Sequence, residues 1–257
     1  MIKTTPFKMV FIIRDYMVLD CIWEHNGDDT LLYAADYPGA YSRGSNLQLA
    51  KDKMKVELYS YLSWIGLPSP EYVSVHIIQD APCKLTICDA DSDILFDSER
   101  RPLTKEEYGR LKMLTLKSAR DFLTLYDSIP EKMLSNQSPR STFYGSVPRT
   151  ANEMYQHTKN VNAYYFGEID VPADNVGSIL SCRENGFDKL EQSLDFLDNS
   201  VIEGSYGELW TLRKVFRRFI WHDRIHAKAM YRLGVSLFGK QQILDPFCFG
   251  ADVCTKL

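Results

Sequence analysis

The spacing of hydrophobic residues changes near residue 100, and this change constrains the fold more than any other feature of the sequence. Before it, short segments rich in β-branched and aromatic residues alternate with turn residues. After it, hydrophobic residues recur at helical spacing in four segments separated by loops. The polar stretch Asp89–Arg101, which precedes Pro102, has the character of a linker. The sequence therefore predicts an α+β domain over residues 1–100 and an all-α domain over residues 101–257.

The first part has several strand-like segments and one helical segment. Strands are predicted at Phe7–Ile13, Tyr16–Trp23, Thr30–Ala35, Val73–Ile78 and Lys84–Cys88. Asn26-Gly27 is typical of a tight hairpin turn between two of them. Ser45, followed by Gln48 three residues later, predicts the capped start of a helix that ends near Trp64.

The second part carries two further capping patterns. Thr104 is followed by Glu107, and Thr150 by Glu153, in the spacing in which the two side chains cap each other's backbone. Helices are expected from Thr104 to about Ser128, from Thr150 to about Phe166, over Ser178–Leu197 and over Glu208–Phe238. Four amphipathic helices in succession are typical of a four-helix bundle.

Composition excludes several classes of protein. With 45% hydrophobic and 25% charged residues, the chain is globular rather than disordered. A net charge of −4 does not provide the excess of positive charge that general nucleic-acid binding needs, so we expect no nucleic-acid partner. No stretch approaches the ~20 apolar residues of a membrane span, and we expect a cytoplasmic protein without a membrane partner. The six cysteines form no CxxC pair, which favours reduced, structural thiols.

Two of the five histidines lie four residues apart in the last predicted helix, in His222-Asp223-Arg224-Ile225-His226. This spacing puts both imidazoles on one side of the helix. Val215, Phe219, Ala229 and Leu233 share that side, so it faces the core. The ring nitrogens of two buried imidazoles need bonding partners, and a shared divalent metal would be a partner for both rings.

A third histidine, His157, lies midway along the second predicted helix of this part. Met154, Val161 and Tyr164 share its face, so this ring also points to the core. Three imidazoles from two helices would make an open site for Zn, Ni or Fe(II), with a fourth position for water or substrate. A single core histidine is more often structural than a ligand, and we assign that structural role to His25 and His76.

Other residues near this pattern admit alternatives. A zinc protease of the HExxH type needs a glutamate after the first histidine, where this chain has Asp223, so a salt bridge or a supporting contact is the better expectation for that residue. The basic run of Arg213, Lys214, Arg217 and Arg218 is expected to be a solvated face or an interface with the acidic first part, rather than a ligand site. Arg218 and Tyr164 are speculative candidates for the mouth of the metal site.

The segment Arg149–His157 and the His222–His226 motif resemble the DinB-like family over about residues 104–240. The resemblance implies a four-helix bundle, often dimeric, with a divalent metal held here by His157, His222 and His226. Some relatives in that family are thiol transferases or isomerases that use low-molecular-weight thiols. The residues after His226, Ala227-Lys228-Ala229, differ from the Arg-Gly-Gln that is frequent in the family.

The stretch Asp36–Gly44 and the helix after it resemble the HicB-like fold over about residues 8–70. HicB antitoxins bind a small ribonuclease toxin. This chain shows no helix-turn-helix and no basic arm, so the resemblance favours an accessory or dimerisation domain over a working antitoxin.

Three functions remain open at this point. The first is a metal-dependent enzyme that activates a thiol or water for transfer or hydrolysis of a small-molecule substrate. The second is a non-catalytic protein whose metal joins two helices. The third is an antitoxin-like binding module. An open coordination position would favour the first, and a fourth protein ligand the second.

Overall fold

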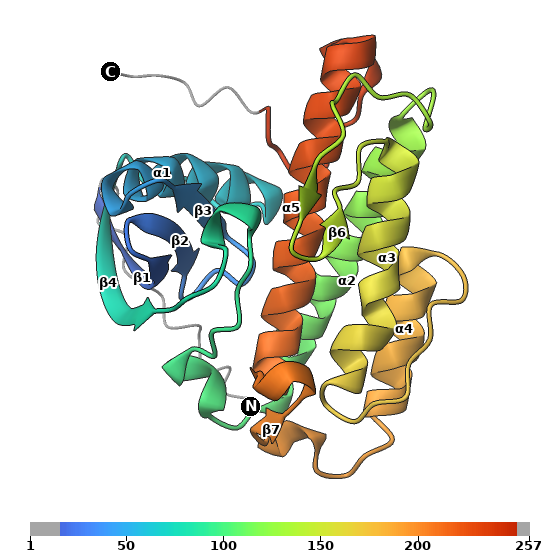
Figure 1. The fold of residues 1–257 in the computed structure, drawn as a ribbon. Coiled ribbons are helices and arrows are strands. Elements are labelled where there is room, and N and C mark those ends of the chain that lie inside the picture. The colour runs from blue at the N-terminus through green and yellow to red at the C-terminus, as the bar shows by residue number, and fades with distance from the viewer. Residues whose placement is uncertain (1–15, 251–257) are drawn as a thin grey trace, which may run out of the picture.

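A computed structural model describes residues 16–250 of the chain. The strand predicted at Phe7–Ile13 and the residue Cys254 lie outside this range. The first part of the described chain is a mixed sheet with one helix on it, and the second part consists mainly of four longer segments of helix (Figure 1).

The sheet has four strands in the order β3-β2-β1-β4. β1 (Tyr16–Asn26) pairs antiparallel with β2 (Asp29–Ala34), β2 pairs antiparallel with β3 (Tyr41–Gly44), and β1 pairs parallel with β4 (Tyr72–Pro82). The predicted hairpin is confirmed, because Asn26 faces Asp29 across a two-residue turn in which Gly27 has a φ of +60°. The strand predicted at Lys84–Cys88 is wrong, since that segment leads into the short 3₁₀ helix Ile87–Asp89.

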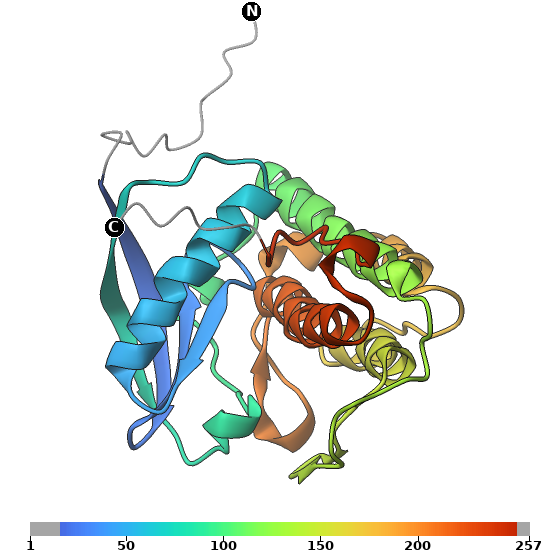
Figure 2. The ribbon, with the colours of Figure 1, turned by 90° about the horizontal axis from the view of Figure 1, so that it is seen from above.

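Helix α1 (Leu47–Trp64) connects β3 to β4 and packs on one face of the sheet (Figure 2). Its N-cap is Asn46, whose side chain accepts a hydrogen bond from the Leu49 backbone N–H at 2.9 Å. The predicted cap at Ser45 is therefore wrong by one residue. Asparagine caps as well as serine does, so the sequence held two adjacent candidates.

The second part contains α2 (Lys105–Ser128), α3 (Ala151–Gly167), α4 (Ile179–Leu190) and α5 (Leu212–Phe238). The capping boxes at Thr104/Glu107 and Thr150/Glu153 are both present. α4 ends seven residues before the predicted Leu197. α5 begins after the predicted Glu208, because Leu209–Trp210 pairs with another strand and Thr211 caps the helix. Short 3₁₀ helices lie at Asp97–Arg100, Phe196–Asp198, Ser205–Gly207 and Lys240–Gln242.

Two small hairpins interrupt the helices. One pairs β5 (Ser141–Thr142) with β6 (Gly145–Ser146), inside the predicted loop between α2 and α3. The other pairs β7 (Ile202–Glu203) with β8 (Leu209–Trp210), between α4 and α5. The second part is therefore not all-α.

The prediction of an all-α four-helix bundle for residues 101–257 is wrong, although the α+β start is as expected. The described residues hold five α-helices, and one hydrophobic core joins α1 to the later helices through Met54, Phe122, Met154 and Met230. α5 lies between the sheet and the remaining helices (Figure 1) and is buried on both sides. In a helix bundle the outer face of each helix is exposed, whereas α5, the longest helix, has only Arg232 and Ser236 exposed, both near its C-terminal end.

Close contact between the sheet and α5 depends on the turn before β3. Gly39 in this turn has a φ of +86°, and a Cβ at this position would collide with the Ile220 side chain. Beside it, the Trp221 ring packs against Tyr33 and Tyr41 of the sheet. Ile220 and Trp221 are therefore core residues between α5 and the sheet.

No helix within residues 16–250 is both long and apolar enough to cross a membrane. The five cysteines in this range, Cys21, Cys83, Cys88, Cys182 and Cys248, form no disulfide with one another.

Candidate metal centre

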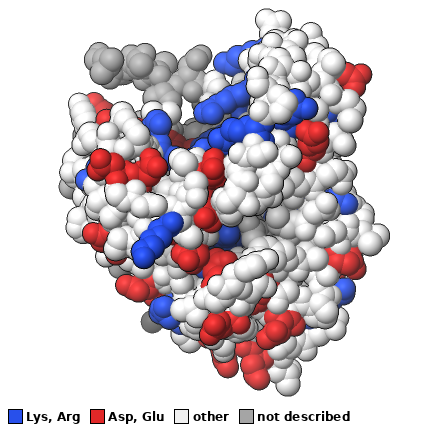
Figure 3. Space-filling view, viewed as in Figure 1, with Lys and Arg blue, Asp and Glu red and all other residues white. Residues whose placement is uncertain are grey.

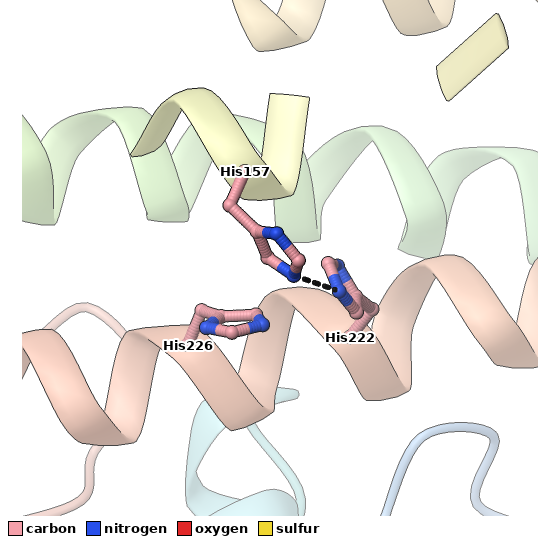
Figure 4. A group of neighbouring side chains, drawn as sticks. All are labelled: His157, His222 and His226. Atoms are coloured by element: carbon pink, nitrogen blue, oxygen red, sulfur yellow. Dashed lines mark hydrogen bonds between the residues drawn. The ribbon is translucent and has the colours of Figure 1, made fainter. Parts of the chain in front are cut away.

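Helices α3 and α5 bring three histidine side chains together. His157 comes from the middle of α3, and His222 and His226 come from successive turns of α5 (Figure 4). One ring nitrogen from each lies within 4.8 Å of the others. The ring centres are 5.0 Å apart for His157 and His222, 4.6 Å for His157 and His226, and 4.5 Å for His222 and His226.

The spacing of the ring nitrogens suits a divalent ion. Tetrahedral bonds of about 2.0–2.1 Å to zinc place two ligand nitrogens roughly 3.3 Å apart. The Nε2 atoms of His157 and His222 are 3.2 Å apart. The three ligand atoms, one from each ring, all lie within 4.8 Å of one another.

All three rings are in the protonation state that binds a metal. Burial lowers the pKa of His157, and burial together with the neighbouring histidines and the Arg218 and Arg183 charges lowers that of His222 well below 6.5. Burial, with a smaller contribution from His157, lowers the pKa of His226 to about 3. The rings are therefore neutral near pH 7, and neutral imidazole is the metal ligand.

The rings have little else to bind. Within the part of the chain that the structure describes, the three histidines make a single hydrogen bond, the one between His157 and His222. The Nδ1 atom of His222 is buried without a partner among the same residues. A buried polar atom without a partner costs free energy, and an ion bound at Nε2, the atom that faces His157, would not supply a partner for Nδ1.

No fourth protein ligand is evident among residues 16–250. The group of histidine, cysteine and carboxylate side chains that could hold an ion contains only His157, His222 and His226. Three protein ligands leave a coordination position for water or substrate, which is the pattern of catalytic rather than structural zinc sites.

Asp223 is engaged elsewhere. Its two carboxylate oxygens accept hydrogen bonds from the Arg183 guanidinium at 3.2 and 3.3 Å, and both side chains are fully buried. The contact ties α4 to α5. This is the salt bridge expected for Asp223, and it occupies the carboxylate that a protease-like general base would need.

The aromatic residues next to the histidines were not all found from the sequence. Tyr165, the neighbour of the predicted Tyr164, lies edge-on to His222 with ring centres 6.1 Å apart. Tyr164 is 38% exposed and packs against Trp210 instead. Burial raises the pKa of the Tyr164 hydroxyl, so that group stays protonated.

A second aromatic residue contacts the histidine group through His157. Tyr144, in the turn of the β5–β6 hairpin, stacks on His157 with ring centres 6.3 Å apart and remains 46% exposed. Sequence reasoning missed it. The only available signal was the aromatic pair Phe143-Tyr144 inside an otherwise polar loop.

Part of the basic run on α5 forms an interface with the first part of the chain, which is one of the two structural roles expected for it. Arg217 pairs with Glu99, and the Lys214 ammonium donates to the Asp93 carbonyl. Basic and acidic side chains also lie next to one another along the hollow between the two parts of the molecule (Figure 3). His25 and His76 lie on the sheet, where their rings contact the carboxylates of Asp80 and Asp20, and His76 is an exposed residue rather than the core histidine expected.

No family model, no curated protein and no solved structure matches this chain.

Proposed function

We propose that this protein binds one divalent metal ion, Zn, Ni or Fe(II), through His157, His222 and His226, and that it is a metal-dependent enzyme. The observation that carries the proposal is the convergence of three neutral imidazoles with no fourth protein ligand among the described residues. The motif resemblance to the DinB-like family supports the same three ligands, residue by residue.

A divalent ion in such a site lowers the pKa of a thiol or water in its remaining position, and so supplies a nucleophile at neutral pH. The chain's own residues provide the surroundings. Burial keeps the three rings neutral. The Tyr165 ring lies beside His222 and the Tyr144 ring beside His157. We propose a small molecule as substrate, with a low-molecular-weight thiol as the co-substrate if the reaction is a thiol transfer.

Two assays separate the two reaction types. In the first, metal-loaded protein receives a simple thiol and a chromogenic alkylating reagent, so that sulfur loses its proton, bonds to carbon and expels the leaving group. In the second, it receives an activated ester and water. Each assay compares the wild type with His157→Ala and with His76→Ala, a matched control because His76 lies on the sheet and bonds Asp20.

We expect a metal-dependent rate in the wild type and in His76→Ala, and none in His157→Ala. Stoichiometric metal without activity in either assay would contradict the enzyme proposal. It would favour the second candidate, a metal that holds α3 against α5, because the three ligands come from these two helices.

A further inference from the structure

Arg218 is an exception among the basic residues of α5. Five others on this helix form ion pairs with acidic side chains: Arg213 with Glu107, Lys214 with Glu208, Arg217 with Glu99, and both Arg224 and Lys228 with Glu57. Arg232 is exposed to solvent. Arg218 is only partly exposed, and the described residues 16–250 offer its guanidinium no ion pair.

The guanidinium of Arg218 is enclosed by aromatic rings. Its Cζ atom lies 4.7 Å from the centre of the Trp221 ring and 5.6 Å from those of Tyr165 and Trp210. One nitrogen donates to the Ser92 carbonyl at 2.9 Å, and Nε is buried without an acceptor among the described residues. Because a guanidinium carries five N–H donors, most of its hydrogen-bonding capacity remains unused in an apolar setting.

Three acidic side chains interact electrostatically with Arg218, and each of them is hydrogen-bonded or ion-paired to another group. Glu24 accepts hydrogen bonds from the Tyr33 hydroxyl and from the backbone N–H groups of Asp93 and Ile94. Glu208 pairs with Lys214, and Asp91 accepts from the Thr86 backbone N–H. None of these carboxylates forms an ion pair with Arg218 among residues 16–250, although Glu24 and Glu208 interact with its charge over a longer distance.

Arg218 also borders the metal centre. It lies one helical turn before His222, a spacing that places two side chains next to each other on the same face. The Tyr165 ring contacts both, at 5.6 Å from the Arg218 Cζ atom and 6.1 Å from the His222 ring centre. The same Tyr165 ring therefore lies beside both the Arg218 guanidinium and the metal-ligand candidate His222.

We propose that Arg218 is the recognition site for a carboxylate on the ligand whose other end occupies the metal centre. The planar fork of a guanidinium matches the two oxygens of a carboxylate, and enclosure by three rings strengthens a charge-assisted pair. The ligand class is a small carboxylic acid that carries a thiol or another metal-binding group. The inference rests on the proposed metal site.

The test uses calorimetric titration of the zinc-loaded full-length protein. The probes are a short series of ω-mercapto carboxylic acids of increasing length, each compared with its own methyl ester. Acid and ester share the thiol and the chain, and the ester replaces the negative charge with a methyl group. The titrations are repeated on Arg218→Gln and on Arg232→Gln, which removes the same charge from an exposed position of the same helix.

We expect at least one acid to bind the wild type about tenfold or more tightly than its ester, the effect of one charge-assisted pair. Arg218→Gln should abolish this preference with zinc content unchanged, and Arg232→Gln should keep it. Equal binding of every acid and its ester by the zinc-loaded wild type would overturn the inference, as would a preference that survives in Arg218→Gln. A wild type that takes up no metal would instead overturn the proposed function, and zinc content distinguishes the two failures.

Discussion

The Nε2 atoms of His157 and His222 lie 3.2 Å apart, although the two residues are 65 positions apart in the chain and come from different helices. Two neutral rings at this distance can share one hydrogen, but the third ring, His226, then has no partner among the described residues. A divalent cation would satisfy all three rings together, which makes the metal content of the protein the main question.

Metal removal should destabilise the fold. A ligand that binds only the folded state at about a hundred times its dissociation constant adds roughly 2.7 kcal/mol to the free energy of unfolding. We expect a chelator to lower the free energy of unfolding of the zinc-loaded wild type by about this amount, measured by urea titration. His157→Ala should fold and should respond to neither zinc nor chelator. An equal response in that variant would contradict the assignment of His157 as a ligand.

The metal-free protein should lose stability as the pH falls. Burial holds the pKa of His226 at about 3, against 6.5 for an ordinary ring, and lowers those of His157 and His222 as well. Between these values the unfolded chain binds more protons than the folded one, so the free energy of unfolding falls as the pH drops below about 6.5.

The control for this pH dependence is His226→Gln, which removes one of the three groups. Urea titrations across the acid range should show a shallower loss of stability in the metal-free variant than in the metal-free wild type. Parallel curves would show that His226 does not titrate differently in the two states.

Tyr144 should control access to the metal rather than affinity for it. Its ring stacks on His157 from an exposed hairpin, so removing the ring opens a path to the site. We expect Tyr144→Ala to bind one zinc ion and to release it several-fold faster to a chromogenic chelator. Phe143→Ala is the matched control. Phe143 packs on Tyr144 and, among the described residues, its ring does not contact His157. Equal release rates in Tyr144→Ala and wild type would contradict this role.

The Asp223–Arg183 pair should stabilise the fold without taking part in metal binding. Asp223→Ala leaves a fully buried guanidinium without its carboxylate, which costs about 3–5 kcal/mol in comparable buried pairs. Glu106→Ala, at the exposed pair with Arg110, should cost less than about 1 kcal/mol. Urea titration measures both. Zinc stoichiometry that falls in a folded Asp223→Asn variant would contradict the separation of this pair from the metal centre.

Local signals in the sequence predicted local structure well. Asn26-Gly27 specifies a hairpin turn because glycine adopts a positive φ without strain, and Thr104 and Thr150 specify helix starts because each has a glutamate three residues later. The HxxxH spacing predicted that His222 and His226 share a face. All of these depend on residues a few positions apart.

What the sequence could not provide depends on packing between distant segments. Ile220 and Trp221 have the same hydrophobic character whether they face a helix or a sheet, so the burial of α5 on both sides was not predictable from its pattern. The stacking of Tyr144 on His157 depends on how the β5–β6 hairpin folds back over α3. The lack of an acidic partner at Arg218 emerges only after every nearby carboxylate has been placed.

The three-histidine metal site can be tested by the metal content of protein purified without a histidine tag, measured by inductively coupled plasma mass spectrometry beside the His222→Ala/His226→Ala double variant. We expect about one divalent ion per chain in the wild type, as three ligands for one ion require, and none in the double variant. A wild type that holds no metal after incubation with Zn, Ni and Fe(II), or a double variant that keeps its full metal content, would contradict the proposed metal site.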